Sequence, residues 1–238
     1  MRRLILILLL CPAVLCSATG PDAMIVRAAR AYESGEWASA QAMYSLVTER
    51  EPDDALPYGR AIVAASMRGD TASVCPLLEK GLQAGVPLDS LLGVIENGAL
   101  ALGEGSMYLS TLDRIAATLP YLRRPVDVRL LNYFKFRRDA ANTALYARRL
   151  LAGLPEDARY LNDLAWAEAM QGNFTEAETA WRKVLEYHPD NLEALTALGN
   201  MLVETHPDEA LVLLGRANEL HPSNYLASLI SKLKQRTR

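Results

Sequence analysis

The chain has 238 residues, of which 50% are hydrophobic and 22% charged, and this balance excludes a disordered protein, which would need low hydrophobicity and a high net charge. Its 25 basic and 28 acidic residues give a net charge of −3, which argues against a general nucleic-acid-binding surface. Three cysteines cannot build a disulfide scaffold.

Residues 1–18 have the features of a secretory signal peptide. Two arginines precede the uncharged stretch 4–15, which is shorter than the roughly 20 residues that a helix needs to cross a bilayer. Small residues follow at 17–19, so we predict cleavage after Ala18 and export across the inner membrane, with the periplasm as the destination. A buried N-terminal helix or an uncleaved anchor is the alternative.

Cys16 suggests a second form of export. Together with residues 13–15 it loosely resembles the lipidation motif of bacterial lipoproteins, although Leu15 is larger than the residue that usually precedes the lipidated cysteine. An outer-membrane lipoprotein, held by a lipid on Cys16, is therefore the alternative to a periplasmic protein. After cleavage at Ala18 the remaining cysteine would be Cys75, whose apolar neighbours indicate a packing role.

Glycine and proline recur with a period close to 34 residues. The segment 35–40 stands at the same distance from Pro52 as the segment 172–177 does from Pro189. Four prolines follow one another at intervals of 35, 34 and 33 residues: Pro120, Pro155, Pro189 and Pro222. The period predicts six units, at about 21–54, 55–88, 89–122, 124–157, 158–191 and 192–224.

Each unit is predicted to consist of two helices joined by a tight turn. Glycine stands where the first helix should end, and it tolerates the positive φ that such a turn requires; these glycines are Gly35, Gly69, Gly103 and Gly172. Proline then stops the second helix. The last stretch, 224–238, is predicted to form one more helix, apolar on one side and polar on the other, that caps the array.

This pattern resembles the tetratricopeptide repeat, and the resemblance covers about residues 21–222. The fifth unit carries it most fully, through Leu161, Leu164, Ala165, Gly172, Phe174, Ala177 and Pro189. The second to fourth units match it less well, and Arg123 is a one-residue insertion between units. The resemblance implies an all-α solenoid, a right-handed superhelix of about six helix-turn-helix units closed by a C-terminal capping helix.

Motifs of catalysis and metal binding are missing from the sequence. It contains no glycine-rich phosphate loop, no paired Cys-x-x-Cys and no His-Glu-x-x-His. The histidines stand before prolines in separate units, at His188, His206 and His221, so they should not converge on one metal ion. We therefore predict a non-enzymatic protein with no cofactor, no bound metal, no small-molecule substrate and no nucleic-acid partner.

The resemblance implies that the first helix of each unit lines a concave groove in which peptides lie extended. Asn97, Asn132 and Asn200 share one inward register, and Trp166 takes it in the fifth unit. The other predicted groove residues are Tyr32, Met67, Phe136, Asn162, Met170 and Val203. Asparagine amides can bind a peptide backbone, while the aromatic and methionine side chains offer apolar pockets. The alternative is that these asparagines are merely solvated and these aromatics pack between repeats.

The function predicted from these observations is a protein-interaction scaffold of a bacterial cell envelope, with a protein or peptide partner in the concave groove. Lys135 and Arg159 stand near the groove but do not complete the basic clamp with which some members of the family hold a C-terminal carboxylate. The alternative is a structural subunit of a larger envelope assembly. It would associate through apolar residues of the second helices, for which Leu109, Leu145 and Val212 are candidates.

Overall fold

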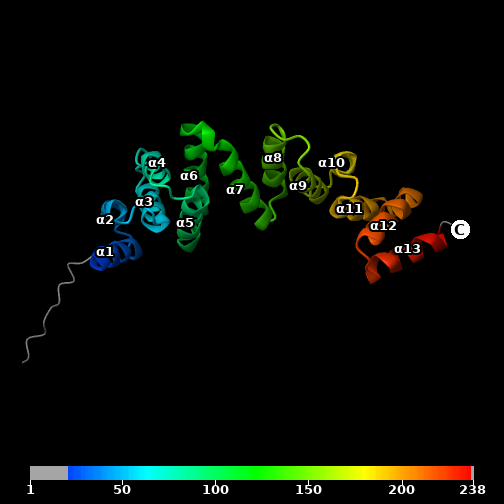
Figure 1. Ribbon diagram of the computed structural model, residues 1–238, viewed down its shortest axis with the longest axis horizontal. Helices are drawn as coiled ribbons and strands as arrows, with labels where there is room; N and C mark the ends of the chain where they lie inside the picture. Colours follow the sequence, from blue (N-terminus) through cyan, green and yellow to red (C-terminus); the bar gives the residue numbers. More distant parts are fainter. Residues whose placement is uncertain (1–20, 237–238) are drawn as a thin grey trace, which may run out of the picture. The chain divides into compact units, whose positions relative to one another are not determined.

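The computed structural model describes residues 21–236, so the predicted signal peptide and Cys16 lie outside the described residues. Within this range the chain forms thirteen α-helices and one short 3-10 helix, without any strand (Figure 1). The prediction of an all-α fold is confirmed. The chain divides between Thr118 and Leu119 into two compact units, the first and the second unit, each of which contains several of the predicted helix pairs. The predicted insertion at Arg123 lies close to this boundary.

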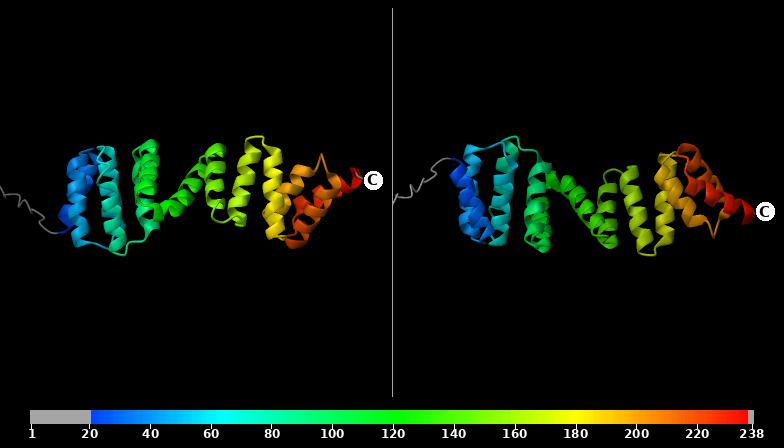
Figure 2. Two further views of the ribbon diagram at one scale, coloured as in Figure 1. Left: turned by 90° about the horizontal axis from the view of Figure 1, so that it is seen from above. Right: turned by 90° about the horizontal axis from the view of Figure 1, so that it is seen from below.

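The first unit contains three antiparallel helix pairs, which stand side by side in both views of Figure 2. Its helices are α1 (Pro21–Glu33), α2 (Trp37–Arg50), α3 (Ala55–Met67), α4 (Val74–Gln83), α5 (Leu88–Ala101) and α6 (Gly105–Thr118). Helix α3 packs against α2, α4 and α5, so it lies at the centre of this unit. Cys75 is buried at the start of α4, as its apolar neighbours predict.

The second unit contains three more pairs and a final helix. It begins with η1 (Pro120–Leu122) and continues with α7 (Arg123–Phe136), α8 (Ala140–Leu151), α9 (Ala158–Met170), α10 (Phe174–Tyr187), α11 (Leu192–Leu202), α12 (Pro207–Leu220) and α13 (Asn224–Arg236). Each helix packs mainly on its neighbours in the chain, and α13 closes the unit against α12. None of the helices between residues 21 and 236 combines the length and apolar character that a bilayer span requires.

Five of the six turns between paired helices in the described residues use the left-handed backbone conformation; the turn between α11 and α12 does not. The four glycines predicted for these turns, Gly35, Gly69, Gly103 and Gly172, have φ between 75° and 82°. In the fourth pair the corresponding position is occupied by Arg138, with φ of 57°. It is the one residue other than glycine with positive φ in the described part of the chain.

Helix starts are set by short polar side chains. The carboxylates of Asp54, Asp139 and Asp157 accept hydrogen bonds from backbone N–H groups in the first turns of α3, α8 and α9. The amide oxygen of Asn191 does the same for α11. Because each cap supplies an acceptor to an N–H that has no partner within its helix, the end of the helix is defined by the sequence itself.

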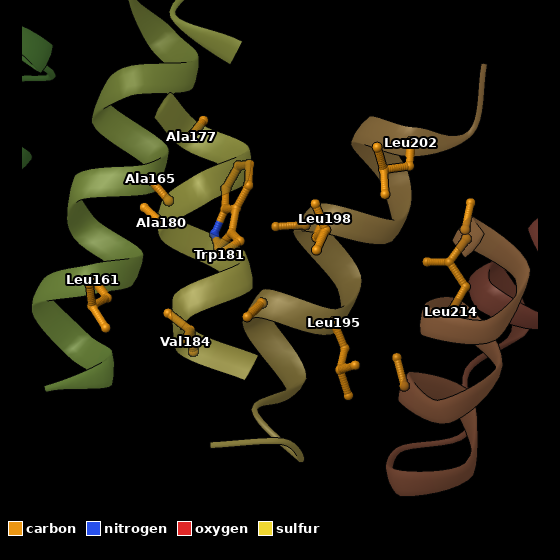
Figure 3. Packing of buried hydrophobic residues seen from close by; sticks show 14 of the residues in the cluster. Leu161, Ala165, Ala177, Ala180, Trp181, Val184, Leu195, Leu198, Leu202 and Leu214 are labelled. Atoms are coloured by element: carbon orange, nitrogen blue, oxygen red, sulfur yellow. The ribbon is translucent and has the colours of Figure 1, made fainter. Parts of the chain in front are cut away.

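The core of the second unit is built around Trp181, which is 2% exposed (Figure 3). Small residues of α9 and α10 let the two helices approach, and large aliphatic residues of α11 and α12 fill the space beyond Trp181. The labelled members of this cluster are Leu161, Ala165, Ala177, Ala180, Val184, Leu195, Leu198, Leu202 and Leu214. Every helix of this unit from α9 to α13 contributes to the cluster, so no pair buries its apolar face alone.

Candidate functional site

The first helices of three successive pairs, α7, α9 and α11, carry the predicted groove residues of the second unit. Asn132 and Phe136 are one turn apart on α7, and Trp166 and Met170 are one turn apart on α9, so each couple lies on one helix face. Phe136 is 92% exposed, Met170 58% and Trp166 46%. The chain therefore leaves three large apolar side chains open to solvent on this part of the unit.

Trp166 is held in a fixed orientation. Its indole Nε1 donates a hydrogen bond to Oε1 of Glu193 at 2.8 Å, which ties α9 to the start of α11. Its ring packs edge-to-face on the core residue Trp181, with centroids 5.2 Å apart. Because the ring is already ordered and still half exposed, a partner could cover it with little further loss of side-chain entropy.

Asn162 does not lie in an open groove, and the prediction that it contacts a peptide is wrong. Its side chain is 3% exposed, and its Nδ2 donates to Oδ1 of Asn191 at 3.3 Å and to Oε2 of Glu193 at 3.2 Å. A partner cannot reach a buried amide that is already bonded to the next helix. Asn162 instead positions Glu193, the residue that orients Trp166.

A small pocket lies beside Trp166. Its volume is about 210 Å³, and it is lined by Lys135, Arg138, Ala140, Thr143, Asp163, Trp166, Ala167, Met170 and Glu193. The ammonium of Lys135 lies 2.5 Å from Oδ1 of Asp163 and links α7 to α9 across the pocket. The volume is below the range of typical small-molecule sites, about 300–1,000 Å³, and suits a single side chain better than a free ligand.

The remaining predicted groove residues of the second unit, Asn200 and Val203, lie at the end of α11. Asn200 is exposed on α11, and its Oδ1 accepts a hydrogen bond from the hydroxyl of Tyr225 on α13 at 3.3 Å. Val203 is half-buried just after α11. The Asn200 amide nitrogen stays available for a partner, whereas its oxygen is already engaged with the capping helix.

Tyr32, in the first unit, is a core residue, and its predicted place in the groove is wrong. It is 3% exposed, and its ring makes edge-to-face contacts with Trp37 and Tyr44. The guanidinium of Arg60 covers the ring at 4.3 Å, and burial raises the pKa of the Tyr32 hydroxyl above its ordinary value. Tyr32 stands on the first helix of its pair, as predicted, but neighbouring aromatic rings cover it.

Two further predicted residues belong to the first unit. Met67 is half-buried at the end of α3, and Asn97 is exposed on α5. Neither of them lines the pocket beside Trp166. The second unit therefore holds the arrangement in which polar anchoring and exposed apolar surface coincide.

Sequence reasoning missed three charged residues of the pocket, Arg138, Asp163 and Glu193. Arg138 could have been found, because it occupies the fourth turn at the position where four other turns carry glycine. Asp163 is half-buried on α9 and Glu193 is exposed on α11, and only their contacts with Lys135 of α7 and Trp166 of α9 reveal their place at the pocket.

Two further features concern the chemistry of this region, potential metal ligands and carboxylates with shifted pKa values. No group of three or more histidine, cysteine or acidic side chains in residues 21–236 could hold a metal ion. The lowered pKa values of carboxylates here have structural causes: hydrogen bonds from Asn142 lower the pKa of Asp139, and hydrogen bonds from Arg159 lower that of Asp157. Both carboxylates are helix caps outside the pocket.

A second hollow lies on α8, α9 and α10 of this unit. It has a volume of about 540 Å³ and is formed by α8, α9 and α10, with apolar lining from Leu151, Leu161, Leu164 and Ala180. The carboxylate of Glu168, with a 2% exposed side chain, accepts hydrogen bonds from Arg148 and Asn173 at its edge. None of the predicted groove residues lines it.

Comparison with protein families and curated proteins finds two similarities. A family model described as tetratricopeptide repeat matches residues 158–191, which comprise α9 and α10. Over 175 residues, 68% of this chain, the sequence is 31% identical to "Cellulose synthase operon protein C" of Pseudomonas fluorescens strain SBW25. The chain spans about 13% of the length of that relative.

Solved structures with a similar helix arrangement include two repeat proteins. The TPR2AB domain of yeast Sti1, in a complex with pHSP90, is 17% identical, with a TM-score of 0.42, 90% of this chain covered and 98% of the other. The C-terminal part of a TPR repeat-containing protein from Cytophaga hutchinsonii is 13% identical, with a TM-score of 0.49, 82% of this chain covered and 78% of the other.

Proposed function

We propose that the chain, whose residues 158–191 match the tetratricopeptide repeat, is a non-enzymatic scaffold that holds a protein or peptide partner on the face formed by α7, α9 and α11. Trp166 is the observation that carries the proposal. A tryptophan that is anchored by Glu193 and Trp181 and yet 46% exposed has the properties of an interface hot spot.

The surroundings of Trp166 favour an extended segment of polypeptide as the partner. Met170 and Phe136 add exposed apolar surface for side chains, and the exposed amides of Asn132 and Asn200 can bond to main-chain groups. The pocket accepts one side chain at a time. We expect a dissociation constant on the order of micromolar, because the anchors are few and the rest of the face is polar.

We place this scaffold in a bacterial envelope, in the periplasm. Support comes from the signal peptide predicted at 1–18 and from the similarity to a Pseudomonas protein. Attachment to the outer membrane through a lipid on Cys16 is the alternative. Metabolic labelling with a fatty acid distinguishes the two, because a Cys16→Ala chain that labels as well as the parent would eliminate the lipid.

Affinity capture tests the proposed face. The chain lacking residues 1–18 is immobilised beside an Asn132→Ala/Trp166→Ala variant and a control variant, Leu145→Ala/Val212→Ala, in which two exposed apolar residues of α8 and α12 are removed. We expect envelope proteins retained by the parent and the control to be lost from the groove variant. Far-UV circular dichroism checks that all three remain helical. Equal retention by all three would show that the partner binds elsewhere.

Self-association through the second helices is the alternative function. Val212 of α12 is 70% exposed and Leu145 of α8 is 42% exposed, and the apolar hollow of about 540 Å³ lies between α8 and α10. If this face joins copies of the chain, sedimentation should show oligomers that Leu145→Ala/Val212→Ala disrupts. A monomer at high concentration would contradict this alternative.

A further inference from the structure

The helix pair α7–α8 differs in charge from the rest of the protein. Residues 119–151 carry a net charge of +6, whereas the whole chain carries −3. The basic residues in this segment are Arg123, Arg124, Arg129, Lys135, Arg137, Arg138, Arg148 and Arg149. Three of them, at 135, 137 and 138, are gathered where α7 ends, beside the Trp166 pocket.

This basic end of α7 is not a general requirement of the fold. A cation at the end of a helix complements the helix dipole; among the other first helices α1 has Arg30 in its last turn, whereas α3, α5, α9 and α11 have no basic residue there. Lys135 does occupy the last turn of α7.

The backbone of Arg138 is in a strained conformation. The turn hydrogen bonds at Arg138 and Asp139, to the carbonyls of Lys135 and Phe134, repeat those made by Gly172 and Asn173 in the next pair. The turn thus has the geometry of a glycine turn, with arginine in the left-handed position at φ 57°. Glycine adopts this conformation without strain, whereas arginine does not. Backbone strain that persists at one such position indicates a use for the side chain.

The side chain of Arg138 lines the pocket and is uncommitted. Among the described residues it has no carboxylate partner. The two acids of the pocket are engaged, since Asp163 pairs with Lys135 and Glu193 accepts from Trp166. The pocket therefore has an apolar wall and, where it meets the α7–α8 turn, a cation available to an incoming anion.

We propose that the pocket binds an acidic, extended segment of the partner: one bulky apolar side chain packs on Trp166 and Met170, and a neighbouring aspartate or glutamate pairs with Arg138. This inference rests on the proposed function and specifies the chemistry of the partner. Arg138 complements the acidic residue of such a segment at the α7–α8 turn, and the engaged carboxylate of Glu193, which also lines the pocket, orients the acidic residue toward that turn.

Synthetic peptides of about twelve residues test the proposal on the chain lacking residues 1–18. One probe has a central leucine flanked by aspartate pairs, and two matched probes replace the aspartates with asparagine or with lysine. Fluorescence anisotropy should show that the aspartate peptide binds about tenfold more tightly than the asparagine peptide, because a charge-assisted hydrogen bond is gained. The advantage should shrink as salt is added.

The decisive variant is Arg138→Gly. It removes the cation while restoring the residue that the turn prefers, so the preference for aspartate should be lost while the melting temperature rises by a few degrees. Arg124→Ala is the control: it removes an exposed cation from the opposite end of α7 and should leave the preference unchanged. Trp166→Ala should weaken the binding of all three peptides.

Each alternative result has a defined meaning. Equal binding of the three peptides, or an aspartate preference that survives Arg138→Gly, would overturn the acidic chemistry, and the proposed function would stand if capture still depended on Trp166. No binding of any peptide at about millimolar concentration would overturn the proposal as well. Arg138-dependent binding to vesicles of anionic phospholipid, without binding of the aspartate peptide, would replace the acidic segment by a membrane surface.

Discussion

Gly59 and Gly215 are matched helix-interior glycines whose replacement by alanine should have opposite effects. On α12, nothing lies within 4 Å of a Cβ built at Gly215. On α3, a Cβ at Gly59 would lie 2.4 Å from Cγ1 and 2.6 Å from Cβ of Val94 on α5. Both Val94 atoms are next to the backbone, so α3 and α5 would have to move apart.

The magnitudes follow from two opposing contributions. Replacing glycine by alanine within a helix stabilises the folded chain by about 0.5–1 kcal/mol, and this is the whole effect expected for Gly215→Ala. Overpacking costs about 1–3 kcal/mol, so Gly59→Ala should be destabilising by about 1–2 kcal/mol in total. Val94→Ala should make the same Gly59→Ala substitution much less costly, with a coupling of about 1 kcal/mol or more.

Urea unfolding followed by far-UV circular dichroism measures these changes. Because a repeat array can unfold in more than one step, only variants with unchanged m-values should be compared. A Gly59→Ala chain as stable as Gly215→Ala would show that α3 and α5 do not pack at the distance described here. An absent coupling with Val94 would lead to the same conclusion.

Three further predictions concern the second unit. Trp181→Ala should lower the free energy of unfolding by about 3–5 kcal/mol in urea, because it empties the centre of the core. Asp139→Ala should cost about 1 kcal/mol at neutral pH through the lost cap of α8. The pKa of Asp139 is below its ordinary value of 3.8, so the stabilisation by this cap is present above pH 3.8 and disappears as the pH falls through the lowered pKa. The free energies of unfolding of the parent and of Asp139→Ala should therefore converge in acid. Arg148→Ala should lower the free energy of unfolding by about 2 kcal/mol, because the buried carboxylate of Glu168 keeps fewer partners. Adding Glu168→Gln to this variant should restore much of the lost stability.

The features that could be predicted from the sequence depend on local backbone geometry. The positive φ of Gly35, Gly69, Gly103 and Gly172 is confirmed, because a left-handed turn after a helix favours glycine whatever its surroundings. With proline as the second marker, these residues were enough to predict the all-α repeat fold, which is also confirmed.

The errors in the candidate site have a different physical origin. Helix register gives the direction of a side chain but not the depth at which neighbouring helices cover it. Tyr32 and Asn162 stand on first helices, α1 and α9, as predicted, and are nevertheless buried. Trp37 and Tyr44 enclose Tyr32, and the start of α11 covers Asn162. The partners of Asn162 are 29 and 31 residues away in the chain, beyond the reach of a local pattern.

Arg138 could be predicted from the sequence only in part. The sequence reveals that glycine is missing from the fourth turn, but a degenerate repeat can also change its turn conformation. Only the structure shows that the left-handed conformation is kept with arginine in it and that the side chain lines a pocket with Trp166.

Hydrogen exchange of the protein with and without its captured partner tests the central claim, that the face of α7, α9 and α11 is the binding surface. Bound partner should slow the exchange of backbone amides at 123–136, 158–170 and 192–202, most of all around Trp166. Protection confined to the second helices, at 140–151, 174–187 and 207–220, would contradict the claim and assign binding to the opposite set of helices.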